Sequence, residues 1–363
     1  MHSLKLLQRV TSGGKKILYI DGLRFFCVIT VFIEHFIDYY CDKNPFFAKK
    51  YTIAQYEYIG STGIYLFFSI SGFIIGLPFI RQYLYKEGNV DIKSYFIRRL
   101  TRLEPPYIIL LVSIFILQVF ILQTKSFEAL FPHLLASLFY VHNIIYNEGS
   151  VINPVLWTLE IEIQFYILAP VFALLFRANK IMRRSILFLL IFFWNDINFI
   201  HFEFKTILGY LPFFLIGFLA ADIYMEYKDK IKNSLFFDFL CIIALITAFL
   251  TSNPILILSG NFILLVLSSK SFYFIRLLEK KFLYIIGGMC YTIYMLHQKL
   301  IYYISPLFSK MLFNNYLIDF LIKFTIALSV VLIISVLFFI FVERPTMKKD
   351  WWKYKSFKKL FFE

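Results

Sequence analysis

Long apolar blocks recur along this chain and constrain its fold more than any other feature of the sequence. An α-helix needs about 20 apolar residues to cross the hydrocarbon of a bilayer, whereas soluble core helices are shorter and amphipathic. Ten blocks of suitable length can be read, roughly at 17–39, 59–80, 105–123, 156–176, 185–202, 206–225, 235–252, 254–269, 282–304 and 317–342. They predict an all-α, polytopic transmembrane helical bundle of about ten spans.

Composition supports the same fold class. Hydrophobic residues make up 60% of the chain and charged residues 17%, against about 45–50% and about 25% in soluble domains. We expect one membrane domain over 1–363, with a cytoplasmic N-terminal segment (1–16), a basic cytoplasmic tail (344–363) and no soluble domain. The four cysteines are scattered without metal-ligand spacing, so neither a metal nor a disulfide framework is expected.

The placement of basic residues predicts the orientation. The net charge of +14 could by itself indicate nucleic-acid binding. With the N-terminus inside, however, the inner loops carry 28 Lys and Arg and the outer loops 6. Cytoplasmic loops of membrane proteins show this excess. The basic clusters therefore predict cytoplasmic termini and contacts with membrane lipids, not nucleic acid.

The first span carries charged side chains that are costly in hydrocarbon and mark functional sites by default. They are Asp21, Arg24, Glu34 and His35. Arg24 and His35 are 11 residues apart, which places them about 16 Å apart on nearly the same helix face. This arrangement suits a tunnel that one substrate enters from the cytoplasm and another from outside. Histidine is the natural general base near neutral pH. The alternative is a snorkelling Arg24 and an interfacial His35.

A second group opens the fourth span, where Trp157, Glu160, Glu162, Gln164 and Tyr166 follow one another closely. The two glutamates are separated by about 200° on a helix, so they cannot share one face. One of them is expected to face the interior while the other caps the helix start. Capping alone is the alternative to a site.

Three further features complete the candidates. His297 falls near the middle of the ninth span, where a satisfied buried histidine is the alternative. Arg98, Arg99 and Arg102 share a helix turn before the third span, and gathered guanidiniums suit phosphate capture. Anchoring of the cytoplasmic loop would also explain them. Ser71, in the run 67–76, is a weak candidate nucleophile because no Gly-x-Ser-x-Gly elbow surrounds it, and helix packing is the favoured role of that run.

Together these segments resemble the acyltransferase 3 family, integral-membrane O-acyltransferases that modify cell-surface carbohydrates. The resemblance covers nearly the whole chain, from 19 to 349. Arg24 and His35 with ten residues between them are similar to the family's Arg-x10-His signature. The run 67–76 is similar to its serine-glycine-phenylalanine motif, and Arg98 to Tyr107 to its cytoplasmic arginine motif.

Later segments are similar to the same family. In the run 157–166, which resembles a tryptophan-serine-leucine motif, Glu162 matches the family's first glutamate. The runs 291–297 and 342–345 match late motifs. The chain departs from the pattern at Thr158, which replaces a serine, and at Ile163, which stands in place of a second glutamate. These departures leave every candidate catalytic group in place.

The resemblance implies transfer of an acyl group, usually acetyl from acetyl-CoA as co-substrate, to a hydroxyl of a glycan or glycolipid at a bacterial cytoplasmic membrane. His35, with Glu34 or Glu162 as its orienting group, would be the catalytic base. Arg24 and the arginine motif, with Tyr107, would hold the donor's phosphates. The remaining candidates would line the acceptor pocket: Asp21, Ser71, Trp157, Glu160, Gln164, Tyr166 and His297. No bound cofactor is implied, and a homo-oligomer is possible.

Two other function classes remain open at the level of sequence. A transporter or flippase for a lipid-linked sugar would also carry intramembrane charge around a cavity. Such proteins commonly show internal repeats, and none is evident here. A non-catalytic subunit of a polysaccharide assembly system is the other alternative. Neither of them accounts for the cytoplasmic arginines as directly as an acyltransferase does.

Overall fold

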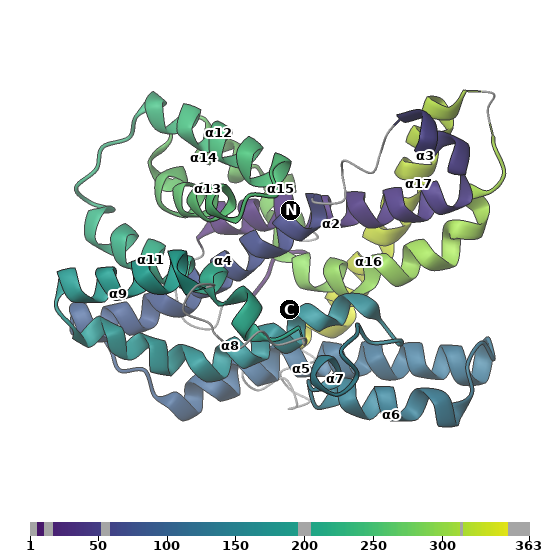
Figure 1. The fold of residues 1–363 in the computed structure, drawn as a ribbon, viewed down its shortest axis with the longest axis horizontal. Helices are drawn as coiled ribbons and strands as arrows, with labels where there is room; N and C mark the ends of the chain where they lie inside the picture. Colours follow the sequence, from purple (N-terminus) through teal and green to yellow (C-terminus); the bar gives the residue numbers. More distant parts are fainter. Residues whose placement is uncertain (1–5, 11–16, 52–58, 195–204, 313–314, 348–363) are drawn as a thin grey trace.

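The computed structural model of the chain describes residues 6–10, 17–51, 59–194, 205–312 and 315–347. Within these ranges the protein is helical and has no β-strand, which confirms the predicted all-α class (Figure 1). The helices are α2 (Leu18–Lys43), α3 (Pro45–Tyr51), α4 (Ile59–Leu84), α5 (Ile92–Ile116), α6 (Phe127–Leu138), α7 (His142–Tyr146), α8 (Trp157–Ala173), α9 (Lys180–Phe192), α11 (Ile207–Tyr227), α12 (Leu235–Leu250), α13 (Pro254–Leu267), α14 (Phe274–Leu278), α15 (Lys281–Gly288), α16 (Cys290–Ile304), α17 (Tyr316–Phe338) and α18 (Arg344–Thr346).

Among the described residues, five helical segments are long and apolar enough to cross a membrane, which supports the predicted membrane-protein character. They are Ile59–Leu84, Ile92–Ile121, Pro154–Arg177, Ile207–Tyr227 and Tyr316–Thr346. Helix α2 has 26 residues, a sufficient length, but it carries the charged groups noted above. Helices α12 and α13 are shorter, with 16 and 14 residues.

Two predicted spans differ from the helices. The third span was expected to begin at 105, but α5 begins at Ile92, because Asp91 caps that end by accepting from Ser94 N at 2.8 Å. The arginine motif is therefore part of the helix. The span predicted at 282–304 is wrong as one continuous helix, since α15 ends at Gly288 and α16 begins at Cys290. Of the span predicted at 185–202, residues 195–202 lie outside the described residues, as do 348–363 of the predicted tail.

The break after α15 lies where this helix meets the start of α2. A Cβ atom added to Gly287 would lie only 1.7 Å from the carbonyl oxygen of Asp21. A second glycine, Gly288, follows directly, and glycine is unfavourable within helices. The glycine pair permits the close contact between backbones but weakens the helix at this point.

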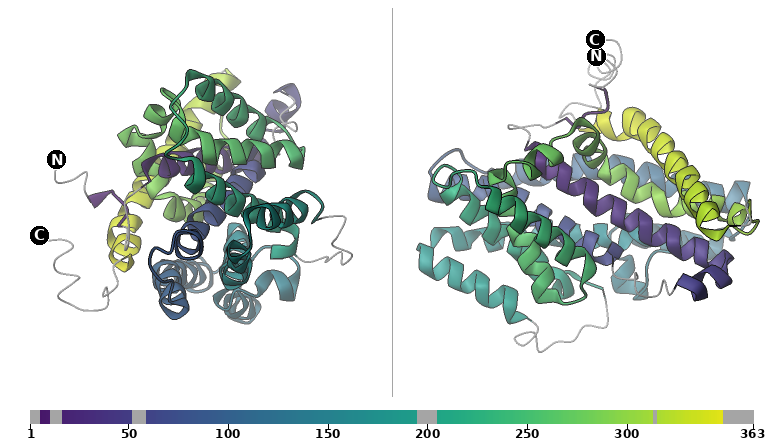
Figure 2. Two further views of the ribbon diagram at one scale, coloured as in Figure 1. Left: turned by 90° about the vertical axis from the view of Figure 1, so that its left-hand side faces the viewer. Right: turned by 90° about the horizontal axis from the view of Figure 1, so that it is seen from above.

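Helix α2 connects the two hydrophobic cores of the molecule. Its first half, including Leu23 and Cys27, packs in one core with α4, α8, α11 and α13. Its second half, including Val31 and Phe36, packs in the other with α5, α16 and α17. Figure 2 shows α2 running along the molecule between these groups of helices. The two ends of α2 therefore lie in different surroundings, although they belong to one unbroken helix.

Helices α4 and α11 cross at backbone contact. A Cβ atom on Gly72 would lie 2.0 Å from the Phe214 oxygen, and one on Gly217 would lie 2.1 Å from the Ser69 oxygen. Only glycine fits at such distances, and small residues permit this kind of approach between membrane helices. The crossing supports the packing role predicted for the run 67–76 and holds the neighbouring Ser71 in place.

Candidate functional site

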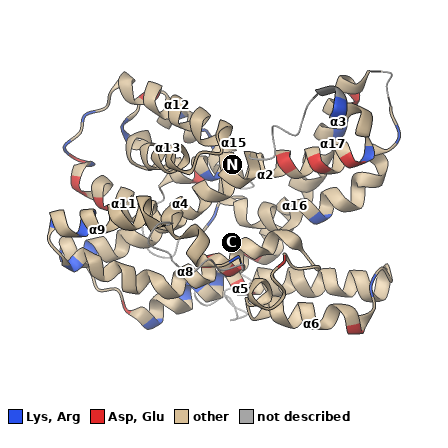
Figure 3. Ribbon diagram, in the orientation of Figure 1, with Lys and Arg blue, Asp and Glu red and all other residues tan. Residues whose placement is uncertain are grey.

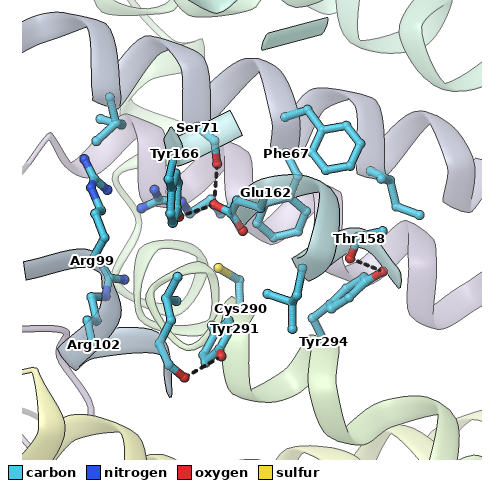
Figure 4. Close-up of a pocket in the computed structure, with 16 residues that line it drawn as sticks. Phe67, Ser71, Arg99, Arg102, Thr158, Glu162, Tyr166, Cys290, Tyr291 and Tyr294 are labelled. Carbon is cyan, nitrogen blue, oxygen red and sulfur yellow. Dashed lines mark hydrogen bonds between the residues drawn. The ribbon is translucent and has the colours of Figure 1, made fainter. Parts of the chain in front are cut away.

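A cavity of about 90 Å³ lies between α2, α4, α5, α8 and α16, with room for several water molecules or a small acyl group. Its ends differ in character: Figure 4 shows Arg99 and Arg102 on one side and Thr158 with Tyr294 on the other. Its polar and ionisable lining residues are Arg24, Ser71, Arg99, Arg102, Thr158, Glu162, Tyr166, Cys290, Tyr291 and Tyr294.

Glu162 lies in the middle of this cavity and accepts two hydrogen bonds. Ser71 Oγ donates to its Oε1 at 2.8 Å, and the Tyr166 hydroxyl donates to the same oxygen at 2.5 Å (Figure 4). The three side chains come from α4 and α8, which are separated in the sequence by α5, α6 and α7. Glu162 thus holds both hydroxyls in defined positions at the centre of the cavity.

Three arginines gather at the basic end of the cavity. Arg24 donates to Asp21 at 2.7 Å, so Asp21 supports an arginine and does not line the cavity itself. Arg99 lies over the ring of Tyr166, with its guanidinium carbon 5.4 Å from the ring centre. In the described part of the chain, neither Arg99 nor Arg102 forms an ion pair. Such a cluster is suited to a bound anion.

Two residues predicted to bind the donor lie elsewhere. Arg98 is on the exposed face of α5. Tyr107 is fully buried, donates to the Ser137 carbonyl at 2.8 Å and stacks on Tyr140. Both residues belong to the arginine motif in sequence, but neither of them lines the cavity.

His35 lies beyond the cavity and close to a second histidine. Its ring centre is 5.2 Å from that of His297 on α16, and its Nδ1 is 3.7 Å from Asp38 Oδ2. The glutamates expected to orient it are engaged elsewhere: Glu34 accepts from Gly60 N at 2.5 Å, and Glu162 is bound as described above. The neighbours of His35 in the structure are therefore Asp38 and His297.

The protonation pattern of His297 follows from its hydrogen bonds. Its Nδ1 lies 2.7 Å from the Tyr294 carbonyl and 3.2 Å from that of Ile293. A carbonyl only accepts, so Nδ1 carries the proton and Nε2 of the neutral ring carries a lone pair. Nε2 is buried without a hydrogen-bond partner among the described residues. The His297 ring also lies 5.6 Å from the ring of Tyr294, which lines the cavity, so Tyr294 and His297 connect the cavity to His35.

The acyltransferase domain family matches residues 17–340, nearly the full length over which these helices and side chains are arranged. The chain belongs to the acyltransferase 3 family. Its relatives include the peptidoglycan O-acetyltransferase OatA of Listeria monocytogenes, 32% identical over 47% of this chain and 26% of that protein. The O-acetyltransferase OatA of Staphylococcus aureus is 30% identical over 46% of this chain and 26% of its own length. The chain thus spans about a quarter of these curated relatives, and no solved structure matches it.

Other predicted pocket residues of this acyltransferase 3 chain hold backbone in place. Glu160, which is buried, accepts from Asn143 N at 2.8 Å and so fixes the start of α7. Gln164 accepts from Ile207 N at 2.8 Å at the start of α11. Trp157 packs against Tyr210. The predicted division between the two glutamates is confirmed in part, because Glu162 faces the cavity while Glu160 caps a helix, although that helix is α7 and not its own.

Two residues near this acyltransferase 3 site, Asp38 and Arg9, are not among those predicted from the sequence. Asp38 lies three positions after His35, a helical spacing that could have indicated the contact. Arg9 lies before the first span and contacts Asp21 through an Nη1–Oδ1 distance of 3.4 Å. No local pattern indicates that a residue in the N-terminal segment returns to the cavity end of α2.

Proposed function

We propose that this protein transfers an acyl group, with acetyl as the first candidate, from cytoplasmic acyl-CoA to a hydroxyl of a bacterial cell-surface glycan. Membership of the family and the relatives named O-acetyltransferases support an O-acetyltransferase of the cell envelope. The observation that carries the finer proposal is the arrangement along α2. An arginine-lined cavity surrounds Arg24, and a histidine pair containing His35 lies further along the same helix.

The proposed topology places the arginines on the cytoplasmic side. Figure 3 shows Lys and Arg gathered around α9 and acidic residues along the α3-side end of α2. Cytoplasmic surfaces are enriched in Lys and Arg. We therefore propose a multi-pass protein of the cytoplasmic membrane, with about ten spans and both termini inside. In this orientation Arg24 faces the cytoplasm and His35 lies in the outer half.

The proposed donor end uses Arg24, Arg99 and Arg102. Guanidinium groups match phosphate oxygens in paired hydrogen bonds, and in the described part of the chain Arg24 pairs with Asp21 while Arg99 and Arg102 form no ion pair. Phosphates held at this end direct the flexible thioester arm of an acyl-CoA into the cavity. Arg24 and His35 are about 16 Å apart along the helix, a separation that a long extended arm can bridge.

The proposed chemical step uses His35 as general base. Its ring nitrogen takes the proton of the acceptor hydroxyl while the hydroxyl oxygen attacks the thioester carbonyl. The carbon–sulfur bond then breaks, the new ester leaves, and the proton passes to the CoA sulfur. His297, whose Nδ1–H is fixed by carbonyls, presents its unpaired Nε2 in the buried space beside His35. As an acceptor, His297 Nε2 can orient the His35 ring through a ring N–H of His35. His297 would then be the third group that positions a catalytic base.

Mass spectrometry of surface glycans tests the function. Cells that carry the gene are expected to show acylated glycans, and cells with the gene deleted are expected to lose that mass increment. Mild base, which cleaves O-esters, should remove it from the first sample and leave the second unchanged. Glycans that keep their acyl content but change in amount or length would instead support a role in export or assembly.

A Ser71→Ala variant is expected to lower the rate of acyl transfer by about ten- to a hundredfold at most, because a hydrogen bond to a charged group contributes about 1.5–3 kcal/mol and each 1.4 kcal/mol is about tenfold in rate. The expectation follows from direct transfer, in which Ser71 only helps to position Glu162. Rates in isolated membranes, normalised to the amount of protein, provide the measurement. Complete loss of transfer, together with an acyl group found on Ser71 in the native protein, would replace direct transfer with an acyl-enzyme mechanism.

A further inference from the structure

The N-terminal segment 6–10 packs against the helices near the basic end of the cavity. Leu7 and Val10 pack on the second hydrophobic core, and Gln8 Nε2 donates to the Tyr284 hydroxyl at 3.4 Å. A Cβ atom on Gly288 would lie 3.7 Å from the Arg9 Cβ, so Arg9 lies against the end of α15. Contacts of the residues before and after Arg9 in the chain therefore hold it in a defined place.

Arg9 and Arg24 share one carboxylate. Arg9 Nη1 lies 3.4 Å from Asp21 Oδ1, and Arg24 Nη1 lies 2.7 Å from the same oxygen. The two guanidiniums are therefore close neighbours, although one comes from α2 and the other from the N-terminal segment. The side chains are nearly buried, with 12% of Arg9 and 11% of Arg24 exposed. Arg9 does not line the cavity itself, but it extends the arginine group of the cavity outward.

The guanidiniums of this group form few ion pairs, although the buried carboxylate of Glu343 also acts electrostatically on Arg9 and Arg102. Asp21 is the only ion-pair partner of Arg9 and Arg24 among the described residues, and Arg102 has none. Arg9 Nε and Arg102 Nε are both buried without a hydrogen-bond partner in that part of the chain. Burial, followed by the nearby charges of Arg24 and Arg102, lowers the pKa of Arg9 to about 9. The surroundings therefore disfavour the charged form of Arg9, and a bound anion would relieve this.

We propose that Arg9 is a further donor-binding residue, which contacts a phosphate of the nucleotide-bearing acyl donor together with Arg24 and Arg102. This inference rests on the proposed use of acyl-CoA and adds a residue from outside the helical motifs. The unpaired N–H groups of buried guanidiniums are the donors that phosphate oxygens require. The alternative is a purely structural Arg9, which holds the N-terminal segment on α15 through Asp21.

Equilibrium binding of CoA to the purified full-length chain in nanodiscs tests the proposal at low and at high ionic strength. Arg9→Gln is expected to raise the Kd for CoA at low ionic strength by about tenfold, the loss of one charge-assisted contact. Its affinity should also depend less on salt than that of the native protein, because one charged contact is gone. Arg9→Lys keeps the positive charge but lacks the paired N–H groups of a guanidinium. Its Kd for CoA should lie between that of the native protein and that of Arg9→Gln.

The matched control is Arg81→Gln, which removes the same charge from an exposed position at the end of α4. It should leave the Kd unchanged.

A Kd for Arg9→Gln equal to the native value would overturn the proposal. So would an equal weakening at both ionic strengths, which indicates a structural role. If the native protein fails to bind CoA, the proposed donor itself is wrong, an outcome distinct from failure of Arg9 alone. If Arg9→Gln does not fold, the test rests on Arg9→Lys. A Kd and a salt dependence of Arg9→Lys equal to those of the native protein would then overturn the proposal.

Discussion

Replacement of His35 by alanine is expected to reduce acyl transfer by at least about a hundredfold, the lower range for loss of a general base. The physical reason is that the acceptor hydroxyl is a poor nucleophile until its proton is removed. Of the two histidines in the pair, His297 is buried and its Nδ1 is hydrogen-bonded to backbone carbonyls, whereas His35 is partly exposed and can reach an acceptor. The measurement is the rate of acyl transfer in membranes, normalised to folded protein.

A second histidine variant provides the control. His133 lies in α6, is hydrogen-bonded to His142 at 2.8 Å and does not line the cavity. His133→Ala should therefore retain most of the native rate. Both variants should elute as single species in detergent, which separates loss of chemistry from loss of fold. Full activity in His35→Ala would eliminate the proposed base and shift attention to Glu162 as the proton acceptor.

Gly217→Ala is expected to cause the largest loss of stability among single methyl additions in α11. Its Cβ would lie 2.1 Å from the backbone oxygen of Ser69, which cannot rotate away, so α4 and α11 must separate. Overpacking in a close-packed interior costs about 1–3 kcal/mol, and a backbone obstacle places the change at or above the upper part of this range. The separation also moves Ser71 relative to Glu162. Thermal unfolding in detergent should show a lower Tm.

Gly209→Ala is the matched control on the same helix. No heavy atom lies within 4 Å of the added Cβ at this position. Alanine is favoured over glycine in helices by about 0.8–1.0 kcal/mol, so the Tm should stay constant or rise slightly. A similar fall in both variants would mean that the helix itself, and not its crossing with α4, is sensitive to the substitution.

Sequence patterns alone predicted the features that depend on local spacing. Apolar block length indicated helices and a membrane protein, and helical periodicity separated Glu160 from Glu162. Gly72 was expected to serve packing, and it does so against Phe214. These conclusions hold because helix geometry fixes which side chains share a face, independently of the rest of the chain.

Contacts between distant segments could not be predicted in this way. His35 and His297 come together from helices at opposite ends of the sequence, and Glu34 turns to Gly60 instead of its neighbour. The placement of Arg9 depends on a segment that packs on α15. Each of these contacts follows from how helices pack, and a single sequence contains no direct record of that packing.

The unbroken course of α2 has a consequence for specificity. Arg24 and His35 are rigidly coupled through eleven residues of one helix, and each half of that helix is enclosed in a separate core. A shift of α2 therefore moves both groups together and leaves their spacing unchanged. A variant that accepts a longer acyl chain cannot arise by separating these two groups. Under the proposed mechanism, selection among acyl chains acts on side chains that line the cavity, such as Phe67 and Tyr294, which can be exchanged without altering the distance from Arg24 to His35.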